Sequence, residues 1–253
     1  MDLSEKLQMV VDVMKDTKEK WVATEPESTD LAIYLHFFRG DELIVTLQCP
    51  LDRDTALKAA SLGASGFCAS TVSATFESYH TTLKESPITG KPWLPKEMQF
   101  VAETVPDAFE KGWVNECLTT SAHERGGKYA MASQPYLIKG TEVEWYEMKS
   151  GIPTGEAHEM TEGVSGYMFD SLQESIARPT IVDALEAQAK EDPMAAMVSN
   201  LIEDPERRQF HIDMATAKAL EENELVVGVM LMAEEGSERQ SWLSERLGEP
   251  TNL

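Results

Sequence analysis

The sequence predicts an α+β protein with a mostly antiparallel sheet, an N-terminal helix and a helical C-terminal half. Three observations lead to this prediction. The first twenty or so residues carry apolar side chains at helical spacing. About residues 30–148 form short segments rich in β-branched and aromatic residues, separated by turn residues. From about residue 165, helical spacing returns and Asp-Pro pairs mark helix starts.

The N-terminal segment has the pattern of an amphipathic helix that ends near Trp21. Asp2 followed by Glu5 resembles a capping box, in which each side chain accepts from the other's backbone N–H. The apolar residues that share one predicted face are Leu3, Leu7, Val10 and Met14.

A β-hairpin follows, because two apolar segments flank a short turn that contains Gly40. Asp52 or Asp54 then caps a helix that ends at Gly63 or Gly66. The expected strands are 31–38, 42–48, 68–81, 114–122, 129–138 and 141–148. Residues 84–98, which contain three prolines and Trp93, are expected to form a loop.

The C-terminal half begins with a polar, acidic stretch over residues 151–166 that is a candidate hinge. Helices follow, with Asp192 and Asp204 as N-caps in front of proline. Residues 225–232 are expected to return as a strand to the sheet, which favours one interleaved domain over residues 1–253. The alternative is a sheet-rich part, 1–150, and a helical acidic part, 165–253.

The charge is strongly negative and unevenly distributed. The chain of 253 residues has a formal net charge of −22. Residues 1–150 carry 23 acidic and 15 basic side chains, a net charge of −8, and residues 151–253 carry 21 and 7, a net charge of −14. Such a field repels nucleic-acid phosphates and anionic lipids, and it attracts basic surfaces. Direct nucleic-acid binding is therefore not expected.

The composition favours a cytoplasmic protein without a membrane span. No apolar run approaches the roughly 20 residues that a bilayer requires. The first residues carry charges where a signal peptide would be apolar. The three cysteines are odd in number and lie in apolar surroundings, as expected of reduced thiols.

Weak signals for metal or catalytic chemistry lie between residues 142 and 162. His158, Glu159 and Glu162 are candidate metal ligands, although a zincin would have His where Glu162 stands. Glu147 and Lys149 form a Glu-x-Lys pattern found in restriction-type nucleases, but the preceding strand lacks the required Asp. No phosphate-binding or dinucleotide-binding glycine pattern is present, so no cofactor is expected.

We therefore expect a non-enzymatic binding protein whose acidic surface engages a basic protein partner or a second copy of itself. The candidate interaction residues are Glu203, Glu206, Glu221, Glu222 and Trp93. One alternative is a carboxylate- or metal-dependent hydrolase or nuclease, and another is a mimic of nucleic acid. The acidic bias would also suit an accessory protein of a bacterium or bacteriophage, although no residue assigns a source.

Overall fold

The computed structural model describes residues 1–25, 31–81, 83–105, 107–147, 149–151, 164–191 and 204–247. These residues form an eight-stranded sheet in which every pairing is antiparallel, in the order β6-β5-β4-β3-β1-β2-β8, with β7 also on β5. The predicted α+β class is confirmed. The strands are β1 Ile33–Arg39, β2 Glu42–Cys49, β3 Thr71–His80, β4 Asn115–Glu124, β5 Tyr129–Lys139, β6 Glu142–Trp145, β7 Lys149–Gly151 and β8 Gly228–Leu231.

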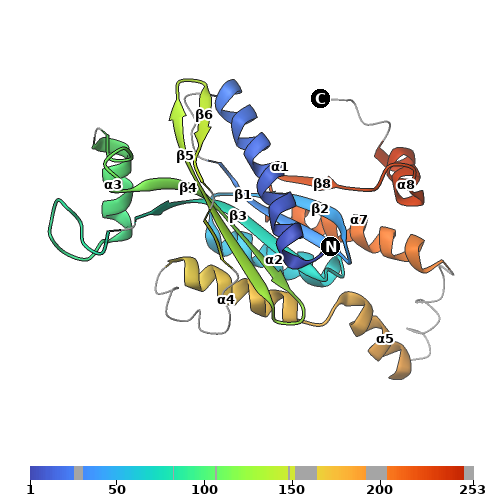
Figure 1. Cartoon of the computed structure of the whole chain (residues 1–253). Helices are drawn as coiled ribbons and strands as arrows, with labels where there is room; N and C mark the ends of the chain where they lie inside the picture. The colour runs from blue at the N-terminus through green and yellow to red at the C-terminus, as the bar shows by residue number, and fades with distance from the viewer. Residues whose placement is uncertain are drawn as a thin grey trace.

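Helices cover both faces of this sheet (Figure 1). α1 crosses one face over β4, β5 and β6, whereas α2 and α4 lie against the other, and α7 packs on α2 and β8. Layers of this kind bury one face of each amphipathic element against the next. The helices are α1 Leu3–Thr24, α2 Arg53–Gly66, α3 Pro95–Thr104, α4 Val164–Ala177, α5 Ile181–Glu191, α7 Pro205–Glu222 and α8 Glu238–Leu247.

The capping box predicted for α1 is confirmed. Glu5 N lies 2.9 Å from Asp2 Oδ1, and Asp2 N lies 2.7 Å from Glu5 Oε2. The helix continues to Thr24, three residues beyond the predicted end. Leu7 and Val11 pack on β4 and β5, and Val10 and Met14 pack on Phe38 of β1.

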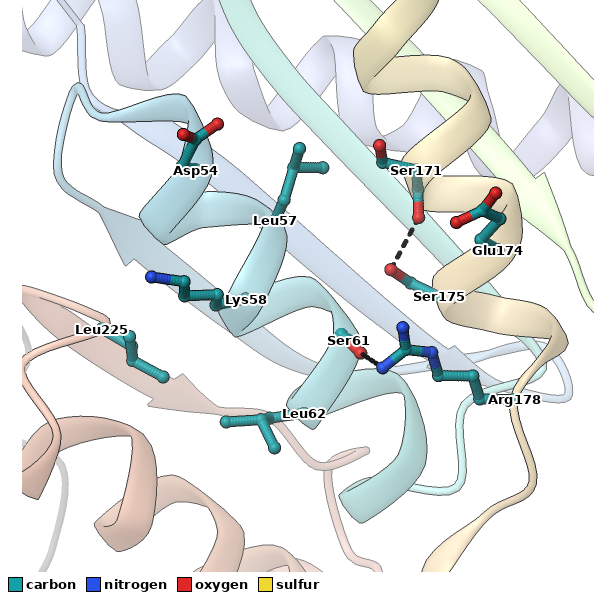
Figure 2. A pocket seen from close by; sticks show the side chains of 10 residues that line it. All are labelled: Asp54, Leu57, Lys58, Ser61, Leu62, Ser171, Glu174, Ser175, Arg178 and Leu225. Atoms are coloured by element: carbon teal, nitrogen blue, oxygen red, sulfur yellow. Dashed lines mark hydrogen bonds between the residues drawn. The ribbon is translucent and has the colours of Figure 1, made fainter.

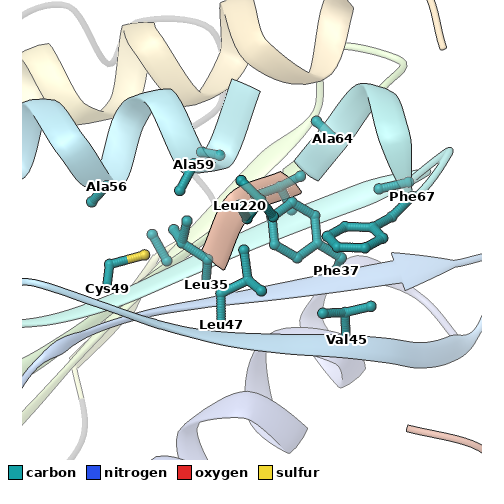
Figure 3. Packing of buried hydrophobic residues seen from close by; sticks show 14 of the residues in the cluster. Leu35, Phe37, Val45, Leu47, Cys49, Ala56, Ala59, Ala64, Phe67 and Leu220 are labelled. Atoms are coloured by element: carbon teal, nitrogen blue, oxygen red, sulfur yellow. The ribbon is translucent and has the colours of Figure 1, made fainter. Parts of the chain in front are cut away.

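On the opposite face, α2 approaches the sheet closely because its inner side carries small residues (Figure 3). Ala56 and Ala59 lie over Leu35, Leu47 and Cys49 in the largest apolar cluster. The close approach depends on glycine at one position. A Cβ added to Gly63 would meet the Phe37 ring at 2.5 Å, so only glycine permits this separation.

The apolar run at residues 225–232 does return to the sheet, as predicted. β8 pairs with β2, placing Val229 opposite Leu47 and Leu231 opposite Val45. This strand connects the C-terminal half to the sheet that the first half forms. Whether the chain unfolds as one cooperative unit remains a prediction.

Two of the shifted boundaries change how a predicted feature is understood. Pro95 occupies the first turn of α3, where its missing N–H costs no hydrogen bond, so the expected loop ends before residue 98. β6 ends at Trp145, so Glu147 lies in the link between β6 and β7 and not at the end of a strand. The Asp192 cap and residues 152–163 of the predicted hinge lie outside the described residues.

In the part of the chain that the structure describes, no helix combines the length and the apolar composition needed to cross a bilayer.

Candidate functional site

The strongest candidate site is a pocket where the β1–β2 turn meets the beginnings of α7 and α8. We call it the α7–α8 pocket; its volume is about 370 Å³. The residues that line it are Arg39, Glu42, Pro205, Glu206, Gln209, Glu234, Ser237, Glu238, Arg239 and Trp242. They come from parts of the sequence that are far apart, so the fold assembles this pocket.

A buried carboxylate, that of Asp213, binds the two arginines that line the pocket. The Asp213 side chain on α7 is fully buried and accepts hydrogen bonds from Arg39 at 2.7 Å and from Arg239 at 2.5 Å. Gln209 Nε2 donates to the same carboxylate at 3.0 Å. Charge-assisted bonds of this kind are stronger than neutral ones, and they tie β1, α7 and α8 into one unit.

The two arginines also bond to the backbone, which fixes their orientation. Arg39 donates to Phe67 O at 2.7 Å, and Arg239 Nε donates to Met232 O at 2.8 Å. Arg239 lies over the Phe210 ring, 5.9 Å from its centroid. The centroid of the Phe210 ring lies 5.5 Å from that of Trp242, and Trp242 lines the pocket.

The rim of the pocket is acidic. Glu206, Glu234 and Glu238 are exposed and Glu42 is half-exposed. With Arg39 and Arg239, the ionisable lining side chains carry a formal charge of −2, before the buried Asp213 is counted. A ring of carboxylates beside an indole is an environment that suits a cationic side chain, through ion pairing and contact with the π-face.

The structure separates the predicted interaction glutamates. Glu206 lines the α7–α8 pocket, at the start of α7. Glu221 and Glu222 are exposed at the other end of the same helix, where Glu222 pairs with Lys218 at 3.5 Å. Glu206 and Glu221 lie about 22 Å apart at about 1.5 Å of rise per residue. Glu203 lies outside the described residues.

Trp93 belongs to a cluster around α3 and does not line the α7–α8 pocket. Its side chain is partly buried in an apolar cluster around α3, with Val101, Ala108 and Val114. The exposed apolar side chains of that region include Ile88, at 53%, Leu94, at 66%, and Phe100, at 59%. Trp93 therefore has a packing role in addition to any interaction that it makes.

The predicted metal and nuclease residues do not come together where the structure describes them. The described residues contain no group of three or more His, Cys, Asp or Glu side chains placed to hold a metal ion. Glu144 pairs with Lys139 across the β5–β6 turn. His158, Glu159 and Glu162 lie outside the described residues, so their role stays a prediction.

Sequence reasoning missed Asp213, the buried carboxylate that holds the two arginines of the pocket, although one signal was present. Asp213 lies three residues after Phe210 and four before Ala217, on the buried face of an amphipathic helix. A carboxylate at such a position requires a cationic partner, because burial of an unpaired charge is costly. The partners, Arg39 and Arg239, lie far away in the sequence and could not be identified from spacing.

Comparisons with protein-family models, with curated proteins and with solved structures find no match to this chain. Function must therefore be inferred from the side chains of the site.

Proposed function

We propose that this protein is a non-enzymatic binding protein whose acidic α7–α8 end engages a basic surface of a protein partner. The observation that carries the proposal is the α7–α8 pocket, with its rim of four glutamates beside Trp242. A lysine or arginine side chain from the partner would enter this rim, and the indole would contact the cation.

The two arginines that line the pocket support a binding role. Arg39 and Arg239 donate hydrogen bonds to Asp213 and to backbone carbonyls, so both guanidinium groups are already oriented in the free protein. A preorganised site loses less side-chain entropy on binding than a flexible one. The overall charge of −22 adds long-range attraction, which raises the association rate with a basic partner.

Two triple Glu→Gln variants, one at the α7–α8 pocket and one around the C-terminal end of α7, test the proposal. In the first, Glu206, Glu234 and Glu238 are changed to Gln; in the matched control, Glu221, Glu222 and Glu224 are changed to Gln. Both sets are exposed and remove equal charge. Partners are captured from lysate at about 0.1 M and about 0.5 M salt, since added salt shortens the range of exposed charge interactions.

We expect a partner with a basic surface that is captured at low salt, released at high salt and lost with the pocket variant. The control variant should retain most of the binding. Equal loss in both variants would show that only net charge matters, and salt-independent capture would contradict the proposal. If the captured partner binds DNA and DNA displaces it, nucleic-acid mimicry is the better description.

A further inference from the structure

A second feature outside the α7–α8 pocket is the helix α5, which carries apolar side chains into solvent. Each residue from 181 to 190 is exposed or half-exposed. Ile181 and Leu185, one turn apart on the helix, are each 38% exposed. In Figure 1, α5 projects away from the sheet beyond the end of α4.

α5 is well capped, yet it is too short to be stable without a partner. The Thr180 N–H donates to Asp183 Oδ2 at 2.8 Å, and the Asp183 N–H donates to Thr180 Oγ1 at 3.1 Å, which forms a capping box. The helix has 11 residues. Isolated helices shorter than about 12–15 residues are marginal in water, and most helices gain stability by packing an apolar face.

The same chain offers an open groove between α2 and α4, which we call the α2–α4 groove (Figure 2). Its volume is about 650 Å³, and Leu57, Leu62 and Leu225 provide its apolar surface. Leu62 is 52% exposed. A groove between two helices with apolar side chains along it is a common receptor for an amphipathic helix.

The charges of the groove also suit a second copy of this acidic chain. Asp54, Lys58, Glu174 and Arg178 line it, so its formal charge is zero in a chain of net charge −22. The groove is therefore a surface where two copies repel each other little. Lys58 and Arg178 complement Asp183 and Glu186 of an incoming α5.

The connection between α4 and α5 is hydrogen-bonded to the body of the protein, and it directs α5 away from α2 and α4 of its own chain. Arg178 O accepts from Arg125 at 2.6 Å, and Pro179 O accepts from Ser65 at 3.0 Å. These bonds hold the corner of residues 178–180 against the body of the protein. α5 starts directly after this corner and leads away from α2 and α4 (Figure 1).

We propose that two copies of this chain associate by exchanging α5, so that each α5 lies in the α2–α4 groove of the other copy. The helix and the groove lie on either side of one corner, so a single surface carries both parts of the contact. A two-fold symmetric dimer uses such a surface twice. This inference does not depend on the α7–α8 pocket.

Sedimentation over a range of protein concentrations tests the association. We expect the parent to approach twice the chain mass of 28.1 kDa. Leu185→Glu on α5 and Leu62→Glu in the groove should each weaken dimerisation by about tenfold or more, because each removes a buried leucine from the interface. Ile88→Glu, at an exposed position outside both features, is the matched control.

A cross-linking experiment tests the exchange itself. Leu62→Cys and Leu185→Cys are placed in separate chains, which are mixed and oxidised. A disulfide-linked dimer that forms only in the mixture supports exchange, with the parent and each single variant as controls. A parent that stays monomeric at all concentrations, or a dimer unaffected by both leucine-to-glutamate changes and without the mixed cross-link, would overturn the proposal.

Discussion

At the residue scale, His36 shows how burial sets the behaviour of one polar group. The imidazole is fully buried in β1, where Nδ1 lies 3.1 Å from Thr46 Oγ1. Nε2 has no hydrogen-bond partner among the described residues. Burial lowers the pKa of His36 to about 3, so the folded protein holds this ring neutral across the physiological range.

The pH dependence of stability should therefore contain a contribution from His36. Below about pH 6.5 the unfolded chain binds a proton at this residue and the folded protein does not. The free energy of unfolding therefore decreases as the pH is lowered, by about 1.5 kcal/mol from about pH 6.5 to about pH 5. Urea unfolding of the parent and of His36→Gln should show this difference. His211→Gln is the control, and parallel pH profiles for the parent and His36→Gln would contradict the assignment.

At the scale of elements, a polar network holds α1 on the sheet. Lys18 is fully buried on α1 and pairs with Glu77 of β3. Glu77 also accepts from the Leu31 N–H at 2.7 Å. The Tyr136 hydroxyl lies 2.6 Å from Glu77 Oε1 and 2.5 Å from Glu116 Oε1. Burial, followed by the charges of these glutamates, raises the pKa of Tyr136, so the phenol keeps its single proton.

The two glutamates should respond differently to the same substitution. Glu77→Gln removes the carboxylate that balances the buried Lys18 charge, and we expect a loss of about 3–5 kcal/mol in the free energy of unfolding. In Glu116→Gln the new amide N–H can donate to the phenol oxygen while the phenol donates its one proton to Glu77, so the loss should stay below about 1 kcal/mol. Urea unfolding followed by tryptophan fluorescence measures both, and equal losses would argue against this network.

At the scale of the whole molecule, β8 and α8 connect the acidic C-terminal half to the sheet. β8 covers the edge of β2, and Arg239 of α8 reaches the buried Asp213 and, at 3.4 Å, Ile44 O of β2. Removal of this segment exposes an unpaired strand edge, which is a site of aggregation. It also leaves Asp213 with one arginine in place of two.

Truncation after Asn223 should therefore reduce solubility and broaden the unfolding transition, whereas truncation after Leu247 should leave both unchanged. Circular dichroism melts and sedimentation of the two fragments make the comparison. If residues 1–150 alone formed a soluble fragment with native-like spectra, the chain would consist of two independent units and the single interleaved domain would be wrong.

The sequence alone predicted the elements whose signals are local. Helical spacing with a capping pair at Asp2 and Glu5 identified α1, and the Asp204-Pro205 pair identified the start of α7, because caps and periodicity depend on neighbouring residues. The hairpin of β1 and β2 was also predicted from a local signal, two apolar segments around a turn that contains Gly40. In the structure Gly40 adopts a positive φ of 60°, as such a turn requires. The boundaries of the hairpin shifted by a residue or two, as helix and strand ends depend on tertiary packing.

Only the tertiary structure decided which side chains share a site. Glu206 was selected from charge alone, as were Glu221 and Glu222, yet one lines the α7–α8 pocket and the others lie about 22 Å away along α7. Arg39 and Arg239 meet at Asp213 although 200 residues separate them in the sequence. Pairing across that separation follows from the order of the strands and from buried charge balance, which no local pattern records.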